Sequence, residues 1–169
     1  MKGKLTFLAL ALLSIATAVA ASSSPAAKNL TQSATGSGQL EFTTDGVTAL
    51  RTFAFEATEA SDGSVTGEAQ INNRSVPGRL HIQIDCLNVI GNDAVMSGTI
   101  TSSTEAGVPA GASSIFGVQD NGEGAGSAPD RITQQFANSG LVCTDITPSN
   151  VGLFTYLLRD VEAGNIQVH

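Results

Sequence analysis

Apolar and polar residues alternate with a period of two in several short runs of this chain. Successive side chains of a β-strand point to opposite faces of a sheet, so this period predicts half-buried strands. The clearest runs cover residues 51–57, 65–72, 79–85 and 94–101. The positions that share the apolar parity in these runs are Phe53, Phe55, Ala57, Val65, Gly67, Ala69, Ile71, Leu80, Ile82, Ile84, Met96, Gly98 and Ile100.

Turn residues separate the predicted strands. Asp62-Gly63 predicts a hairpin turn, and the Gly-Asn-Asp segment 91–93 predicts another, because Gly and Asn tolerate positive φ. Further strands are expected at 114–119, 131–136 and 164–169, while 151–160 fits either a strand or one short helix. We therefore predict an all-β fold, an antiparallel β-barrel or β-sandwich of about eight to ten strands.

The chain has two cysteines, Cys86 and Cys143. The apolar parity changes at Cys86-Leu87, which predicts a β-bulge or a strand bend there. Neither cysteine has a nearby His or a second Cys at metal-ligand spacing, so a disulfide between them is favoured over a reactive thiol or a metal site. A link across so long a loop stabilises a domain by roughly 4 kcal/mol.

The N-terminus has the pattern of an export signal. Lys2 and Lys4 precede an apolar run, and Ala18-Val19-Ala20 supplies small residues for cleavage. The run is too short to span a bilayer comfortably. We predict a signal peptide at 1–20, a flexible leader at 21–38 and a single β domain at 39–169. The protein is then secreted, to the exterior or to a periplasm, with no membrane span.

The composition of the chain narrows the classes of partner that it is expected to bind. The formal net charge is −7, and loss of Lys2 and Lys4 with the signal makes it more negative. Nucleic acid and anionic membranes require cationic contacts, so neither is expected as a partner. The chain has no Trp and one Tyr, so its core is expected to consist mainly of aliphatic side chains.

The acidic loop 120–130 is the best candidate for chemistry. Asp120, Asn121, Glu123 and Asp130 could supply oxygen ligands to a hard cation such as Ca²⁺, although their spacing does not match an EF-hand. The alternative is a hairpin connection, in which Asp120-Asn121-Gly122 forms the turn and Asp130 caps the next strand or pairs with Arg131. Beyond this cation, the sequence indicates no cofactor.

A catalytic set is not evident. His81 lies on the polar side of its run, His169 is the last residue, and no G-x-S-x-G turn is present. We assign no catalytic residue. The first hypothesis is therefore a non-catalytic extracellular module that either binds an extracellular or cell-surface partner or has a structural role. The second is a carrier of a small apolar ligand inside a barrel, and the third is a barrel-fold hydrolase or cyclase.

A signature links these elements. It runs from Cys86-Leu87-x-Val89-x-Gly91-Asn92 through Val118-x-Asp120-Asn121-Gly122-Glu123 and Pro129-Asp130 to Cys143. This order resembles small exported bacterial proteins, many of them actinobacterial, and related post-COAP-1-type β modules. The resemblance covers roughly residues 53–168 and implies a β-rich secreted domain. It implies no activity and no catalytic residue.

Overall fold

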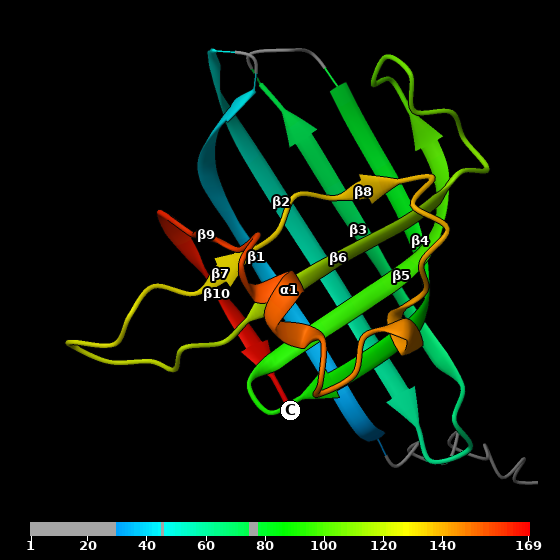
Figure 1. The fold of residues 1–169 in the computed structure, drawn as a ribbon, viewed down its shortest axis with the longest axis vertical. Coiled ribbons are helices and arrows are strands. Elements are labelled where there is room, and N and C mark those ends of the chain that lie inside the picture. Colours follow the sequence, from blue (N-terminus) through cyan, green and yellow to red (C-terminus); the bar gives the residue numbers. More distant parts are fainter. Residues whose placement is uncertain (1–29, 45, 75–77) are drawn as a thin grey trace, which may run out of the picture.

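The computed structural model describes residues 30–44, 46–74 and 78–169. The predicted signal peptide and residues 21–29 of the predicted leader lie outside these ranges. Within them, ten strands form one antiparallel sheet in the order β10-β1-β2-β3-β4-β5-β6-β7-β9, with β8 paired to β6 (Figure 1). The strands are β1 Leu30–Thr44, β2 Val47–Ala60, β3 Val65–Asn73, β4 Gly78–Ile90, β5 Asp93–Ser103, β6 Ser113–Gln119, β7 Arg131–Ile132, β8 Phe136–Ala137, β9 Arg159–Asp160 and β10 Ala163–Val168.

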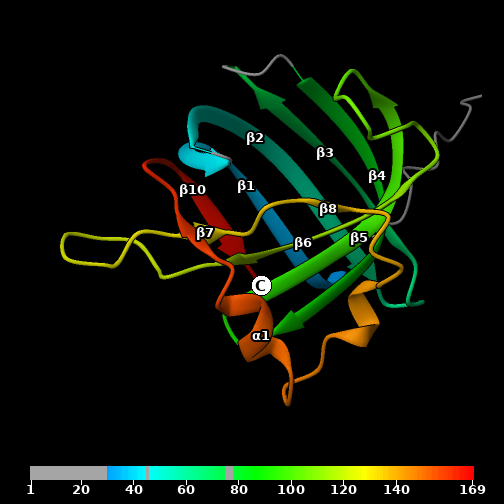
Figure 2. The ribbon, with the colours of Figure 1, turned by 45° about the horizontal axis from the view of Figure 1, so that its top comes forward.

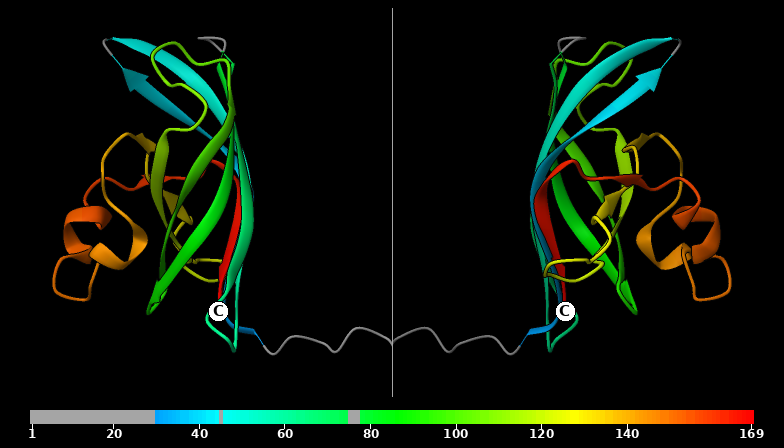
Figure 3. Two further views of the ribbon diagram at one scale, coloured as in Figure 1. Left: turned by 90° about the vertical axis from the view of Figure 1, so that its right-hand side faces the viewer. Right: turned by 90° about the vertical axis from the view of Figure 1, so that its left-hand side faces the viewer.

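The sheet curls into a half-barrel. Strands β10 and β1–β4 form its back wall, and β5 and β6 turn over its concave side (Figures 2 and 3). A 3₁₀ helix, Cys143–Asp145, and a short helix α1, Val151–Thr155, lie outside β5 and β6. The all-β, antiparallel prediction is confirmed, and the barrel alternative describes this single curled sheet better than a two-sheet sandwich.

The core lies on the concave side of the back wall. The apolar parity of the predicted runs faces inward there, as in Ile71, Leu80 and Ile82, each at most 5 % exposed. Phe116 of β6 closes the core from the other side and meets the ring of Phe55 edge to face. A second cluster, which includes Ile115 and Phe154, packs α1 against the outer side of β5 and β6. Side chains of the protein therefore fill the concave interior.

Strand β1 corrects the predicted domain boundary. The leader was expected to extend to residue 38, but β1 begins at Leu30 and pairs with both β2 and β10. Gly36 lies opposite Phe55, and a Cβ on Gly36 would lie 2.8 Å from that ring. Small residues in this part of β1 leave room for the Phe rings of β2. The strand therefore lacks the apolar alternation by which strands are recognised in a sequence.

The parity change at Cys86 is a β-bulge, as predicted. Ile84 pairs with Gly98 and Cys86 pairs with Ser97, so Asp85 is the extra residue of β4. Gly98 allows β4 and β5 to approach closely at this bend, because a Cβ there would overlap the backbone carbonyl oxygen of Gln83.

We expect Gly98→Ala to lower the free energy of unfolding by about 1–3 kcal/mol, since backbone atoms must shift to admit the methyl group. Urea denaturation followed by circular dichroism measures the change. Gly152→Ala is the matched control, because nothing lies within 4 Å of the Cβ it would add to α1. Equal stability of the two variants would contradict a close approach of the strands at Gly98.

Two predicted segments are only partly regular. The stretch 131–136 forms β7, then an irregular segment, and then β8 begins at Phe136. The stretch 151–160 contains both alternatives, α1 first and β9 at its end. Both turns, at Gly63 and Gly91, have the positive φ that was expected. No helix in the described part of the chain is long and apolar enough to cross a membrane.

Candidate functional site

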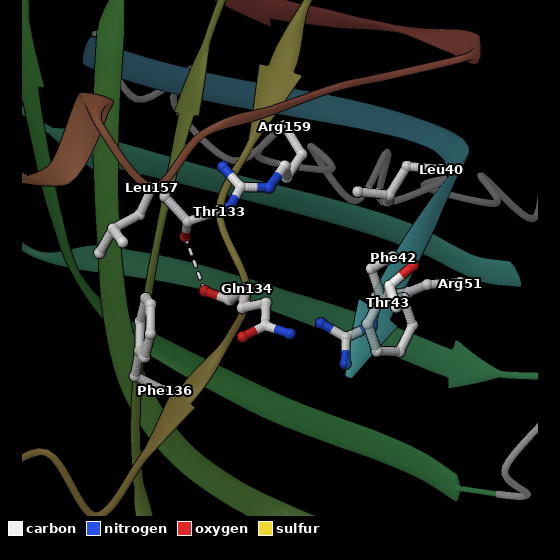
Figure 4. Close-up of a pocket in the computed structure, with 9 residues that line it drawn as sticks. All are labelled: Leu40, Phe42, Thr43, Arg51, Thr133, Gln134, Phe136, Leu157 and Arg159. Carbon is white, nitrogen blue, oxygen red and sulfur yellow. Dashed lines mark hydrogen bonds between the residues drawn. The ribbon is translucent and has the colours of Figure 1, made fainter. Parts of the chain in front are cut away.

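A cavity of about 380 Å³ lies between the β1–β2 hairpin and the segments 133–136 and 157–159. We call it the mouth pocket. Leu40 and Phe42 of β1 form one apolar end, and Phe136 of β8 and Leu157 stand at the other end (Figure 4). Leu157 is 37 % exposed, so this end reaches the surface. The cavity lies beside the filled interior of the half-barrel.

The segment 133–136 is held in place by β6. The Thr133 backbone N–H donates to the carbonyl oxygen of Gly117 over 2.8 Å, and Gly117 N–H donates to the Thr133 hydroxyl over 2.9 Å. Phe136 pairs with Ile115, and its ring meets that of Phe154 edge to face. These contacts fix one wall of the pocket on the rigid sheet.

Polar side chains line the space between the two apolar ends. They are Thr43, Arg51, Thr133, Gln134 and Arg159. The Arg51 guanidinium and the Gln134 amide point toward one another in the cavity, and Arg159 stands on a third side (Figure 4). Among the described residues, no Asp or Glu lines the pocket, although the whole chain has 15 Asp and Glu against 8 Lys and Arg. The lining is therefore cationic in an acidic protein.

Arg51 is held by a short chain of contacts. It is only 7 % exposed, and its Nε donates to Asn73 Oδ1 over 2.7 Å. Asn73 in turn donates from Nδ2 to Glu105 Oε2 over 3.3 Å. The guanidinium carbon lies 4.3 Å from the centre of the Phe42 ring, a cation–π contact. These contacts orient the guanidinium but use only one of its three nitrogens.

The charge of Arg51 is incompletely compensated. Its two terminal nitrogens make no hydrogen bond to the residues that the structure describes, and its guanidinium forms no ion pair with a described carboxylate. Burial lowers the pKa of Arg51 below its ordinary value, and the Glu105 carboxylate opposes that shift in part. The terminal nitrogens of Arg51 are not among the described side-chain atoms that are buried without a partner, so they reach the open cavity, where a ligand group could bond to them.

The sequence predictions did not include Arg51, yet its pattern carries a signal. Arg51 has the same parity as Phe53 and Phe55, so the period of two already places it on the inner face. Asn73 likewise continues the parity of Ile71, and Arg51 and Asn73 face each other in the register of β2 and β3. Polar residues at apolar positions are the mark that could have identified this site.

The acidic loop binds strand β10. Asp130 accepts from Asn121 N–H at Oδ1 over 2.9 Å and from Ile166 N–H at Oδ2 over 2.7 Å. Asp120 accepts from Gly122 N–H at Oδ1 over 2.8 Å and from Val168 N–H at Oδ2 over 3.1 Å. The two carboxylates therefore take the place of a neighbouring strand along the free edge of β10. We call Asp120, Glu123 and Asp130 the β10 clasp.

The other two candidate metal ligands, Glu123 and Asn121, also form hydrogen bonds within the protein. Glu123 Oε1 accepts from the side-chain amides of Asn165 and Gln167, at 3.1 and 3.0 Å. Asn121 donates from Nδ2 to the Pro129 carbonyl oxygen over 2.6 Å. The structure thus brings Asp120, Asn121, Glu123 and Asp130 together, and it shows each of them in contact with protein groups.

A calcium ion in this loop would have to compete with those contacts. Four backbone N–H groups already donate to the carboxylates of Asp120 and Asp130. Within the described part of the chain, no group of three or more His, Cys, Asp or Glu side chains is arranged to hold a metal ion. Calcium binding stays a prediction.

The charged residues next to the clasp form separate contacts. Arg131 Nε lies 3.3 Å from Asp160 Oδ1, so its ion pair is with Asp160 of β9. Asp93 accepts from the Gln119 amide over 3.0 Å. Burial raises the pKa of Asp93, while that hydrogen bond and the charge of Arg131 oppose the rise. These contacts join β5, β6, β7 and β9 beneath the loop.

The two cysteines form a disulfide, as predicted, with Cα atoms 5.8 Å apart. His81 is half-buried on the convex face of the sheet, in a groove whose other polar residues include Arg79 and Gln70. No carboxylate of the described residues accepts a hydrogen bond from its imidazole. The convergence of His81 with an acid that a hydrolase would need is therefore not formed there.

Comparisons with known proteins do not extend these observations: no protein-family model, no curated protein and no solved structure matches this chain.

Proposed function

We propose that the protein is an exported, non-catalytic binding module that takes a small ligand into the mouth pocket. The observation that carries this proposal is a cavity of about 380 Å³, open to solvent, with aromatic and aliphatic side chains at both ends. Pockets for small molecules in proteins have roughly this size and combine an apolar lining with a few placed polar groups.

The contrast with the rest of the half-barrel supports the proposal. The concave interior is packed with buried side chains, so the space for a ligand lies between the β1–β2 hairpin and the segments 133–136 and 157–159, and not in the centre of the barrel. One wall of the pocket is fixed on β6, and the other belongs to the long β1–β2 hairpin. The disulfide is consistent with export, because disulfides persist mainly in oxidising compartments.

Fluorescence titration with Nile red, a neutral apolar dye, tests the proposal. We expect saturable binding to one site in the unmodified protein and its loss in Gln134→Trp. Gln134 is an exposed lining residue, so the indole fills the cavity without entering the core. Thr35→Trp is the matched control, because Thr35 is exposed on the outer face of β1.

The result that would overturn the proposal is equally direct. If the unmodified protein shows no saturable binding, or if Gln134→Trp binds the dye as well as Thr35→Trp does, the mouth pocket is not a ligand site. Unfolding curves of both variants show whether either indole has disturbed the fold.

A further inference from the structure

We propose that the natural ligand of the mouth pocket carries a carboxylate, which pairs with Arg51, on an apolar body that lies toward Phe136 and Leu157. This inference rests on the proposed function and names the class of ligand: amphipathic monocarboxylic acids. Arg159 contributes a second positive charge at the exposed side of the same cavity.

The geometry of Arg51 matches a carboxylate. Its Nε is occupied by Asn73, and the Phe42 ring lies against the guanidinium carbon. The two terminal nitrogens make no hydrogen bond to a described residue, and the side chain points into the cavity (Figure 4). Two N–H donors in one plane suit the two oxygens of a carboxylate.

The electrostatics point the same way. The pocket has two arginines and no carboxylate in its described lining, whereas the protein as a whole is acidic. The Glu105 carboxylate favours the charge of Arg51 only from a distance, since Glu105 bonds to the Asn73 amide and not to the guanidinium. A ligand carboxylate would bond to the guanidinium directly in a partly dehydrated place, where such a pair is worth most.

The apolar end of the pocket offers a surface for the apolar part of the ligand. Phe136 and Leu157 stand across the cavity from Phe42 and Arg51 (Figure 4). Neither residue is fully buried, and Leu157 is 37 % exposed. An alkyl or aryl group that covers them removes apolar surface from water while its acid group stays at Arg51.

Isothermal titration with three ligands of one chain length tests this inference: decanoate, 1-decanol and decylammonium. We expect decanoate to bind about 10- to 100-fold more tightly than 1-decanol, which is the range for a hydrogen-bonded charge in a partly buried site. Decylammonium is expected to bind more weakly than 1-decanol, because it places a like charge beside Arg51.

Variants assign the preference to the pocket. Arg51→Met keeps a long apolar side chain and removes the charge, so most of the preference for decanoate over 1-decanol should be lost. Arg159→Met changes an exposed residue and should reduce the preference in part, even if Arg51→Met does not fold. Arg79→Met removes the same charge from the convex face, outside the pocket lining, and should leave all three affinities unchanged.

The outcomes separate this inference from the proposed function. If 1-decanol binds and is displaced by Nile red but decanoate binds no more tightly, the pocket is a ligand site and the inference that its ligand carries a carboxylate is overturned. If decanoate is preferred equally by Arg51→Met and the unmodified protein, the inference is also overturned. If none of the three ligands binds while Nile red still does, the inference fails and the proposed function stands; if Nile red does not bind either, both proposals fail.

Discussion

Replacement of both cysteines by alanine is expected to lower the free energy of unfolding by about 4 kcal/mol. The disulfide links Cys86 of β4 to Cys143 across a sequence separation of 57 residues, and so long a loop gains much entropy when the link is absent from the unfolded chain. Urea denaturation of Cys86→Ala/Cys143→Ala against the unmodified protein measures the loss. A typical domain has only about 5–15 kcal/mol in total, so a decrease of this size is severe.

The loss of stability should be largest in the layer outside β5 and β6, which contains the 3₁₀ helix and α1. Cys143 anchors the 3₁₀ helix there, where Ser97 accepts a hydrogen bond from its backbone N–H and Asn88 donates to its carbonyl oxygen. Amide hydrogen exchange should therefore rise more in residues 143–155 than in β2 or β3.

The control is the unmodified protein after reduction, which keeps both sulfur atoms and removes only the link. It should show nearly the same loss of stability as the double variant. A reduced protein as stable as the oxidised one would mean that the packing of Cys143, and not the covalent link, holds this layer.

Asp130→Asn is expected to lower the free energy of unfolding by about 2–4 kcal/mol. The Asp130 carboxylate accepts from two backbone N–H groups, and the bond from Ile166 N–H is buried. An asparagine of the same shape offers one oxygen, and its NH₂ group then faces a donor that keeps no partner. Hydrogen bonds to a charged acceptor are worth about twice those to a neutral one.

Glu123→Gln is the matched control for the clasp. Glu123 also accepts from β10, but it is exposed and its partners are the side chains of Asn165 and Gln167, which water can replace. We expect a change below about 0.5 kcal/mol. The exchange rate of the Ile166 amide should rise strongly in Asp130→Asn and little in Glu123→Gln. Similar stability of the two variants would contradict a structural role of Asp130 at the edge of β10.

These two sites show how far sequence reasoning extends. The count of two cysteines, in a chain expected to be exported, predicted the link between Cys86 and Cys143, because two cysteines have only one way to pair. The acidic loop was recognised as unusual, and the structure places its carboxylates against strand β10. Its contacts could not be predicted, since they depend on β10, which lies more than 30 residues further along the chain and is brought to the loop by the tertiary fold.

The local pattern of the chain determined the strands, their inward faces, the turns at Gly63 and Gly91 and the bulge before Cys86. Each follows from backbone geometry over a few residues, namely the period of two and the freedom of φ in glycine. The same reasoning missed the first part of β1. Small residues are needed there because the Phe rings of β2 leave no room for a side chain at Gly36. Because this packing constraint comes from a neighbouring strand, it produces no alternation of apolar and polar residues within β1 itself.

The tertiary structure alone decided where a ligand has room. The sequence predictions did not include Arg51, although its parity places a charge at an apolar position. A cavity arises there only because the β1–β2 hairpin and the segment 133–136 meet. Packing over long sequence distances sets both the space and the burial of the charge. The chain's local pattern thus determined an antiparallel β fold, whereas packing between distant segments decided that the strands form one curled sheet and which side chains line a pocket.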